Sequence, residues 1–255
     1  MVIMTVIFSL FLIVLNKIFI FYKLRYKDNT TTASISSLIG IIYGVLAGLV
    51  CLYLMTNNDH ASDAALSEGT AAANIYHGSR WLKEPLQQQL QTDLKNYITN
   101  VITVEWPEMT EGKTVNVENG YNITKMSDAL IKYPIITQAD VMIVNNLIQE
   151  IKNLYKARQQ RIQINDNQLS PEIWEVILIS TILIIVINYA FRVSFYLHVF
   201  GITVFAFMAA AILFLLVTLD RPFQGEFIVE PDALQAVLDL MNHDAKSNTD
   251  VIRSG

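Results

Sequence analysis

The chain has 255 residues, of which 53% are hydrophobic and only 16% are charged, and its mean hydropathy is +0.37. A soluble protein has about 25% charged residues, so the shortfall indicates that lipid solvates part of the chain. The net charge of −5 argues against a nucleic-acid binder, which needs a basic surface, and the single cysteine excludes an intramolecular disulfide.

Four apolar runs are long enough to cross a membrane as helices, because about 20 residues span a hydrocarbon core of about 30 Å. The first run reads as an uncleaved anchor, since its first charge is Lys17 and no small-residue cleavage site follows it. We therefore predict an all-α integral membrane protein with its transmembrane helices in two pairs. The predicted spans run over residues 2–22, 34–55, 173–191 and 195–219, and each of these bounds is approximate.

These spans divide the chain into four parts. The first helix pair occupies residues 1–56, a helical water-exposed segment occupies 57–170, the second pair occupies 171–220, and a C-terminal tail occupies 221–255. In the tail we expect a short amphipathic helix over Pro231–Met241, followed by an unstructured polar end.

The water-exposed segment predicts three helices. Asn57–Trp81 is rich in alanine and could simply continue the second span into water. A second helix starts at Pro85 and should end near Pro107, residues 111–121 read as a loop or short hairpin, and a third helix fits Thr137–Arg161. The apolar stripe of the second helix consists of Leu86, Leu90, Leu94, Tyr97, Ile98, Val101 and Ile102. The apolar stripe of the third helix consists of Val141, Val144, Leu147, Ile148, Ile151 and Leu154.

The short connections of each helix pair are basic, with Lys23, Arg25 and Lys27 in the first and Arg192 in the second. Cytoplasmic loops carry an excess of lysine and arginine, so this rule places the short connections in the cytoplasm. Both termini and the water-exposed segment are then expected on the extracytoplasmic side.

Two motifs in the chain carry a family resemblance. The residues that carry it are Glu68, Ala71, Ala72, Tyr76, Pro85, Leu94, Tyr97, Glu105-Trp106-Pro107-Glu108-Met109, Leu219-Asp220-Arg221-Pro222-Phe223-Gln224-Gly225, Val229, Pro231 and Ala233-Leu234. With these residues the sequence resembles the bestrophin-like family of bacterial membrane proteins, from the second span to about Met241.

The resemblance implies a more distant kinship with bestrophins, which are all-helical, pentameric, anion-selective channels. Their second membrane helix lines a hydrophobic neck and continues into a soluble chamber, which is cytoplasmic, in conflict with the charge rule above. Their fourth span is followed by a proline-phenylalanine motif near an acidic calcium clasp. Pro222-Phe223 matches that motif loosely, but the long acidic cluster is absent, so calcium gating does not carry over. The implied setting is the bacterial cytoplasmic membrane, and the implied partners are lipid, further copies of this chain and inorganic ions.

The second span offers two candidate pore faces. Gly40, Gly44 and Gly48 recur every four residues, with Ala47 and Cys51 on the same side. Such a face favours close helix packing in lipid, and alternatively leaves room for ions in a pore. The bulky opposite face could form a dewetting gate, or it could contact lipid and neighbouring helices. It consists of Leu38, Ile42, Val45, Leu49 and Leu52.

The two family motifs also have two interpretations each. We expect a structural helix end at Glu105-Trp106-Pro107, in which Glu105 pairs with a cation such as Arg80 or Lys83. The alternative is an acidic ring on a cation path. We expect the segment Asp220 to Gly225 to form a structural corner at the membrane surface, with Asp220 and Arg221 as anchors or in an ion pair. The alternative is a corner that gates the pore or binds ions.

Enzyme chemistry has no motif in this sequence. The histidines His60, His77, His198 and His243 show no metal-ligand spacing, and no nucleophile elbow, phosphate loop or dinucleotide fingerprint is present, so we expect no cofactor. Charge inside the spans is nearly absent, which weakens a proton-coupled carrier. The resemblance implies an oligomeric, anion-conducting channel lined by the second span, and the lack of catalytic motifs and the charge-free second span support that prediction. The alternative is a non-conducting scaffold or envelope sensor whose water-exposed segment binds a partner or ligand.

Overall fold

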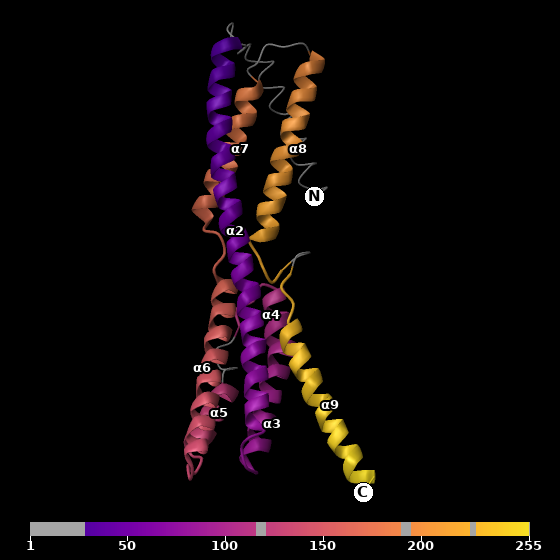
Figure 1. Cartoon of the computed structure of the whole chain (residues 1–255). Helices are drawn as coiled ribbons and strands as arrows, with labels where there is room; N and C mark the ends of the chain where they lie inside the picture. Colours follow the sequence, from indigo (N-terminus) through magenta and orange to yellow (C-terminus); the bar gives the residue numbers. More distant parts are fainter. Residues whose placement is uncertain (1–28, 116–120, 190–194, 225–227, 255) are drawn as a thin grey trace. The chain divides into compact units, whose positions relative to one another are not determined.

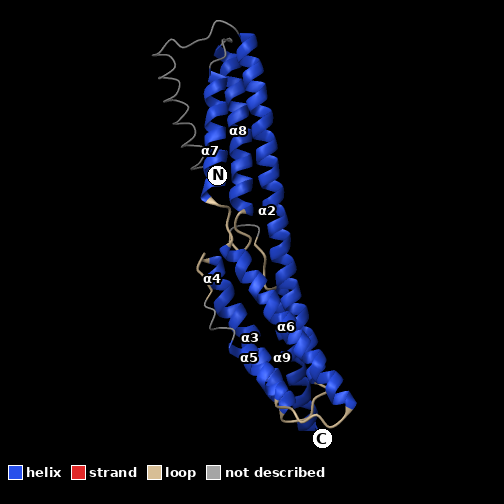
Figure 2. Ribbon diagram, turned by 90° about the vertical axis from the view of Figure 1, so that its left-hand side faces the viewer, coloured by secondary structure: helices blue, strands red, loops and turns tan. Residues whose placement is uncertain are grey.

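The computed structural model describes residues 29–115, 121–189, 195–224 and 228–254, and all regular elements in these ranges are helices (Figure 1, Figure 2). Helices α2, α7 and α8 each contain a stretch long and apolar enough to cross a membrane. The predicted first span, over residues 2–22, lies outside the described residues. The helices are α2 (Asn29–Ser79), α3 (Leu86–Asn100), η1 (Val101–Glu105), α4 (Trp106–Thr110), α5 (Tyr121–Ile131), α6 (Gln138–Asp166), α7 (Pro171–Tyr189), α8 (Phe195–Leu219) and α9 (Asp232–Ser254).

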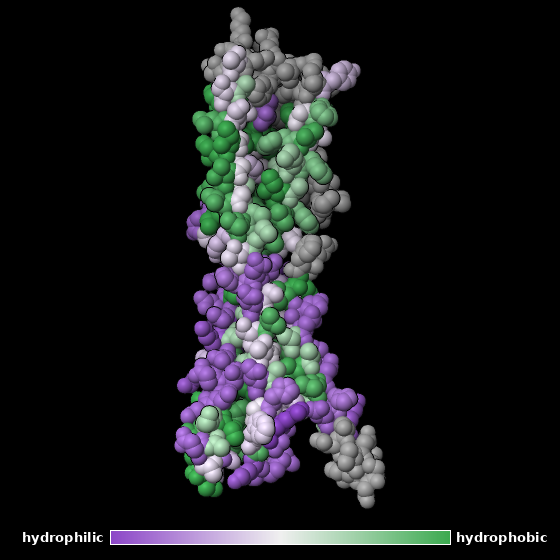
Figure 3. All heavy atoms as spheres, viewed as in Figure 1, coloured by the Kyte–Doolittle hydropathy of each residue, from purple (hydrophilic) through white to green (hydrophobic). Residues whose placement is uncertain are grey.

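The chain divides into two compact units. One comprises residues 1–56 and 169–220, and the other comprises residues 57–168 and 221–255. We call them the apolar unit and the polar unit, after the side chains on the face shown in Figure 3. Helix α2 contributes its first half to the apolar unit and its second half to the polar unit.

In the apolar unit, α2 packs against α7 and α8. Tyr43 and Ala47 of α2 are buried with Ile184 of α7, and Val50 and Leu54 are buried farther along the helix. The Thr181 hydroxyl bonds the Tyr43 hydroxyl at 3.2 Å, so a polar pair is satisfied within the helix bundle. Most other side chains of the three helices remain exposed and apolar, as a lipid-facing surface requires.

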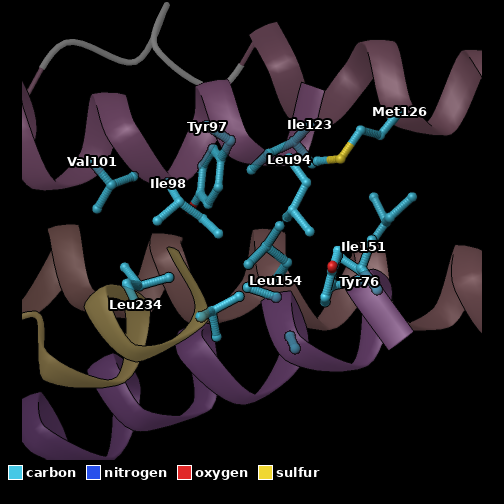
Figure 4. Close-up of a cluster of buried hydrophobic side chains, with 14 of the residues drawn as sticks. Tyr76, Leu94, Tyr97, Ile98, Val101, Ile123, Met126, Ile151, Leu154 and Leu234 are labelled. Carbon is cyan, nitrogen blue, oxygen red and sulfur yellow. The ribbon is translucent and has the colours of Figure 1, made fainter. Parts of the chain in front are cut away.

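In the polar unit, the apolar stripe of α3 forms the centre of the core. Leu94, Tyr97 and Ile98 have no exposed surface, and they point toward Leu154 of α6 (Figure 4). Helices α5, α2 and α9 complete the same cluster with Met126, Ile75 and Leu234, among others. Most of the predicted stripe positions of α3 and α6 are therefore core positions.

Several predicted boundaries are wrong. The alanine-rich segment continues α2 without a break, but α3 does not end near Pro107: the chain passes through the π-helical turn η1 and continues as α4 to Thr110. The widened turn, in which the Trp106 N–H donates to the Val101 carbonyl, puts Pro107 near the start of α4, where a missing N–H is tolerated. Helix α5 was not predicted, and α9 continues beyond Met241 through the tail that was expected to be unstructured.

Candidate functional site

Four charged side chains form a cluster inside the polar unit. Glu68 of α2, Glu105 of η1, and Arg158 and Arg161 of α6 each have no exposed surface. Because the set contains two carboxylates and two guanidinium groups, its formal charge is zero. Burial of an ion is tolerated only with such compensation, so we call this set the charge cluster.

The ion pairs of the charge cluster are close and shared. Arg161 contacts Glu68 through Nε at 2.6 Å and through Nη2 at 3.0 Å, and the same Nη2 lies 2.7 Å from Glu105. Arg158 donates to Glu105 Oε1 from Nη2 at 2.9 Å and from Nε at 3.1 Å. Glu105 therefore joins the two arginines, which corrects the predicted pairing with Arg80 or Lys83. Arg80 instead pairs with Asp244.

Uncharged groups complete the surroundings of the cluster. The Tyr97 hydroxyl donates to Glu68, and burial, reinforced by the Glu68 charge, holds the pKa of Tyr97 well above its ordinary value. The Arg161 guanidinium lies 4.7 Å from the centre of the Trp106 ring and 3.0 Å from Met109 Sδ. Burial lowers the pKa of Arg161, but Glu68, Tyr97 and Glu105 outweigh burial and raise this pKa above its ordinary value, so the guanidinium group stays charged.

The sequence contains a signal for the two arginines. The apolar stripe of α6 proceeds through Ile151 and Leu154 at three- and four-residue intervals, and Arg158 and Arg161 continue it. A cation at a core position requires a buried anion, which Glu68 and Glu105 provide. The predicted stripe ends at Leu154 and therefore does not include the two arginines.

The two family motifs meet at Trp106. Its indole N–H donates to the Val229 carbonyl at 3.0 Å, and its ring meets the ring of the fully buried Phe223 edge-on at 5.9 Å. The Val229 N–H bonds the Pro222 carbonyl at 2.9 Å, which holds the segment after α8 against the tryptophan. Pro107 is exposed, and Gly225 lies outside the described residues. The predicted structural role of the Trp106 and Phe223 side chains is consistent with these contacts.

Asp220 belongs to the apolar unit and is nearly buried. Its carboxylate accepts the Leu169 N–H at 2.7 Å and the Trp174 indole N–H at 3.2 Å, which ties the end of α8 to the start of α7. The contacts described for Asp220 are these two hydrogen bonds, whereas an ion pair was one of the two roles considered for it. Arg221, in the polar unit, is exposed and donates to Gln224 at 2.9 Å.

The two candidate pore faces of α2 differ in exposure. Among the small residues, Ala47 is buried and Cys51 is half-buried against α7 and α8, whereas a Cβ added at Gly40, Gly44 or Gly48 would meet no atom within 4 Å. The bulky face is uncovered along its length, with exposed fractions of 59–63%. Its members are Leu38, Ile42, Val45, Leu49 and Leu52.

The second half of α2 also has an exposed face. Apart from Leu66, which is 60% exposed, its exposed side chains are acidic, hydroxyl, amide and imidazole groups, and from Asp59 onward six of them recur at three- and four-residue spacing. We call this set the polar stripe, and it consists of Asp59, Asp63, Ser67, Thr70, Asn74 and His77. Within the described ranges, no three His, Cys, Asp or Glu side chains are placed to hold a metal ion.

Comparisons with known proteins identify the family. The model of the bestrophin-like domain matches residues 3–234. A bestrophin homologue from Klebsiella pneumoniae carrying a point mutation superposes with a TM-score of 0.69 at 10% identity, covering 95% of this chain and 96% of that one. A structure described as that of a membrane protein gives a TM-score of 0.68 at 12% identity, again covering 95% and 96%.

A search of the curated proteins finds no match by sequence. At these identities the solved structures show the fold alone, whereas the family model covers most of the chain. This is a membrane protein with the bestrophin fold, and the chain belongs to the bestrophin-like family.

Proposed function

We propose that the chain assembles into an oligomeric ion channel in which α2 lines the pore. The observation that carries the proposal is the exposed surface of α2, which is apolar in the first half of the helix and mostly polar in the second half. If the exposed side of α2 faced only lipid and bulk solvent, its apolar and polar residues would not have to lie on one unbroken helix of 51 residues. A water-filled path along an oligomer axis does need such a helix.

The bulky face lines the axis in this proposal. Ala47 and Cys51 pack within their own chain, which removes part of the small-residue face from any pore. Gly44 and Gly48 have open space around them and are available for close approach by a neighbouring copy. Rings of Ile42 and Leu49 around the axis would then form a dewetting gate.

Electrical recording from liposomes tests the pore assignment with a matched pair of variants. Ile42 on α2 and Ile179 on α7 have exposed fractions of 60% and 61%, so Ile42→Ser and Ile179→Ser differ only in the face that they alter. We expect Ile42→Ser to increase the current because a hydroxyl wets the gate, and Ile179→Ser to leave it unchanged. Equal effects would refute the assignment, and no current in any form would refute the channel.

The ion preference has two candidates. Family resemblance favours anions. The polar stripe favours cations, because Asp59 and Asp63 repeat around an axis as acidic rings and the stripe contains no lysine or arginine. The reversal potential in a salt gradient decides between the two, since its sign differs for anions and cations.

The subunit number is proposed to be five, by resemblance. Native mass spectrometry of the purified complex counts the copies as multiples of 28.9 kDa. A dimer, in which α2 of one copy covers α2 of the other, would remove the axial path.

The basic residues of the short connections support a bacterial cytoplasmic membrane protein with its termini and polar unit outside the cell. These residues lie outside the described ranges. Ile136 has an exposed fraction of 75% in the polar unit, so Ile136→Cys in a Cys51→Ala background can react with an impermeant thiol reagent. Labelling of intact cells supports the extracytoplasmic placement, and protection supports the bestrophin-type cytoplasmic placement.

A sensor or scaffold is the second candidate function. A surface groove of about 710 Å³ lies between α2 and α6 in the polar unit, and the exposed side chains of Trp81 and Met142 line it. A groove with an exposed tryptophan is a candidate ligand site. A purified protein without ion flux would favour this function.

A further inference from the structure

We propose that Glu68 is the positioning residue that sets the rotation of α2 in the polar unit, and thereby selects the face that this helix presents. The proposal rests on the proposed channel only for its consequence, which is that the selected face lines the pore. The rotation itself is a property of the polar unit and can be measured without any current.

The buried face of α2 around Glu68 is unusually smooth. Of the positions 61–72, all of which the structure describes, the buried ones other than Glu68 are alanine or glycine. Side chains this small interdigitate little, so within this stretch apolar contact constrains the rotation of α2 mainly where Gly69 lies against Ala233 of α9. The smooth positions are Ala61, Ala64, Ala65, Gly69, Ala71 and Ala72.

Glu68 provides the missing directional contact. Its two carboxylate oxygens meet two nitrogens of one guanidinium, Arg161 Nε and Nη2, at 2.6 and 3.0 Å. A bidentate pair of this kind is restrictive in angle as well as in distance. The Tyr97 hydroxyl donates to the same carboxylate from α3, so α2 is tied to two other helices at one point.

Arg161 is itself immobilised, which makes it a reference for the rotation. Its Nη2 also contacts Glu105 at 2.7 Å, and its guanidinium lies over the Trp106 ring. A helix turns about 100° per residue, so Thr70 lies about 200° around the axis from Glu68. Fixing Glu68 toward α6 therefore fixes Thr70, with Asp63 and Asn74, on the exposed side.

The energetics of buried ion pairs agree with a positioning role. Replacing a buried pair by apolar groups of similar volume is often neutral for stability, because desolvation offsets the attraction between the charges. Polar groups in a core can instead select one register among several of similar energy. Glu68 lies in the stretch of α2 where apolar packing constrains the rotation of the helix least. Removing Glu68 should therefore abolish the preference of α2 for one rotation.

Thiol accessibility measures the rotation directly. In a Cys51→Ala background, Thr70→Cys reports the exposed side of α2 and Ala65→Cys reports the buried side. The test variant combines Glu68→Met, Tyr97→Phe and Arg161→Met, which leaves Glu105 and Arg158 as a balanced pair. With the native cluster we expect Thr70→Cys to react at least about tenfold faster, which corresponds to about 1.4 kcal/mol of protection. In the variant we expect the two rates to converge.

The control variant combines Arg80→Met and Asp244→Asn, which removes an ion pair near the end of α2 whose partners are 47% and 30% exposed. It should keep the native rate ratio. If the triple variant folds and keeps the native ratio, the proposal is wrong.

If the triple variant does not fold, Glu68→Asp decides. It keeps the charge but shortens the side chain by one methylene, so both nitrogens of Arg161 cannot be reached at once. We expect its rate ratio to fall as well, and an unchanged ratio would overturn the proposal. A changed ratio without channel current would support the positioning role and refute the channel, whereas current with an unchanged ratio would do the opposite.

Discussion

Glu105 is the residue on which the charge balance of the polar unit depends most. It contacts both Arg158 and Arg161, and none of these three side chains has any exposed surface. The desolvation of each ion costs several kcal/mol and is offset only while every charge has its partner. Removal of one carboxylate should therefore have a much larger effect than removal of an exposed one.

We expect Glu105→Gln to lower the free energy of unfolding by about 3–5 kcal/mol, because it leaves two buried guanidinium groups with one carboxylate. Chemical unfolding in detergent, followed by tryptophan fluorescence, measures the loss. Asp244→Asn is the control, since it breaks a partly exposed pair with Arg80, and its effect should be far smaller. Similar losses for the two variants would contradict the buried ion-pair network.

Tyr97 predicts a specific alkaline limit to stability. Its pKa is raised in the folded protein by burial, whereas the unfolded chain ionises near 10.0. Its contribution is therefore complete below pH 10.0 and is lost as the pH rises toward the folded pKa. In Tyr97→Phe, the fall of the unfolding free energy between about pH 9 and pH 11 should become shallower, by up to about 1.4 kcal/mol per pH unit.

Tyr155→Phe is the control for the alkaline prediction, because Tyr155 is 49% exposed. It should leave the pH dependence as it is in the native chain. If Tyr97→Phe also leaves it unchanged, the Tyr97 hydroxyl does not sit in the environment described here.

At the residue scale, the sequence predicts positions better than partners. The stripe that contains Ile151 and Leu154 marks Arg158 and Arg161 as core positions, and the Glu-Trp-Pro motif marks Glu105. The contact of Glu68 with Arg161 joins residues 93 positions apart in the sequence. No local pattern specifies such a pair, so it follows only from the packing of α2 on α6.

At the element scale, the closest packing occurs where α9 crosses α2. A Cβ added to Gly69 would collide with the Cβ of Ala233 and lie 2.8 Å from its carbonyl carbon. Ala233 stands in the first turn of α9, whose Leu234 is buried in the core. Glycine at this position therefore allows the first turn of α9 to lie directly on α2.

We expect Gly69→Ala to destabilise the polar unit by about 1–3 kcal/mol, because backbone atoms of α9 must move away. Gly201→Ala on α8 is the control, since its Cβ would meet no atom within 4 Å, and it should cause no loss. Thermal unfolding of the two variants in the same detergent gives the comparison. Equal midpoints would show that α9 does not press on Gly69.

Helix boundaries in the polar unit were predicted less well than helix existence. Pro107 looks like a stop signal, yet the π-helical turn before it restarts the helix. Helix α5 has only 11 residues, so its few apolar positions do not form a stripe long enough to predict a helix. Their role is visible only in the structure, where Ile123 and Met126 pack in the shared core. Periodicity over a long segment predicted α3 and α6 because each contains several turns of one stripe, whereas α2 was predicted from its apolar run and from the alanine-rich segment that follows it.

At the scale of the whole molecule, the part of the chain that the structure describes leaves one side of α2 uncovered. The bulky face and the polar stripe of α2 are exposed in a single copy. An oligomer around an axis would give both surfaces a function, with the apolar part as the gate and the polar part as the wall of a vestibule. The charge of that wall should then control which ions enter.

Asp63→Lys tests whether the charge of the polar stripe determines which ions enter, because it changes the charge of each subunit by two. Rings of like charge create potentials of several kT, which alter local ion concentrations on the order of tenfold or more. We expect the reversal potential in a salt gradient to shift toward that of anions, and the shift to shrink at high salt because counterions screen the ring. Asp128→Lys on α5 makes the same change of net charge at an exposed position away from α2, and it should leave the reversal potential in place. If the two variants shift it equally, the effect comes from the overall charge of the protein, and the polar stripe does not line the ion path.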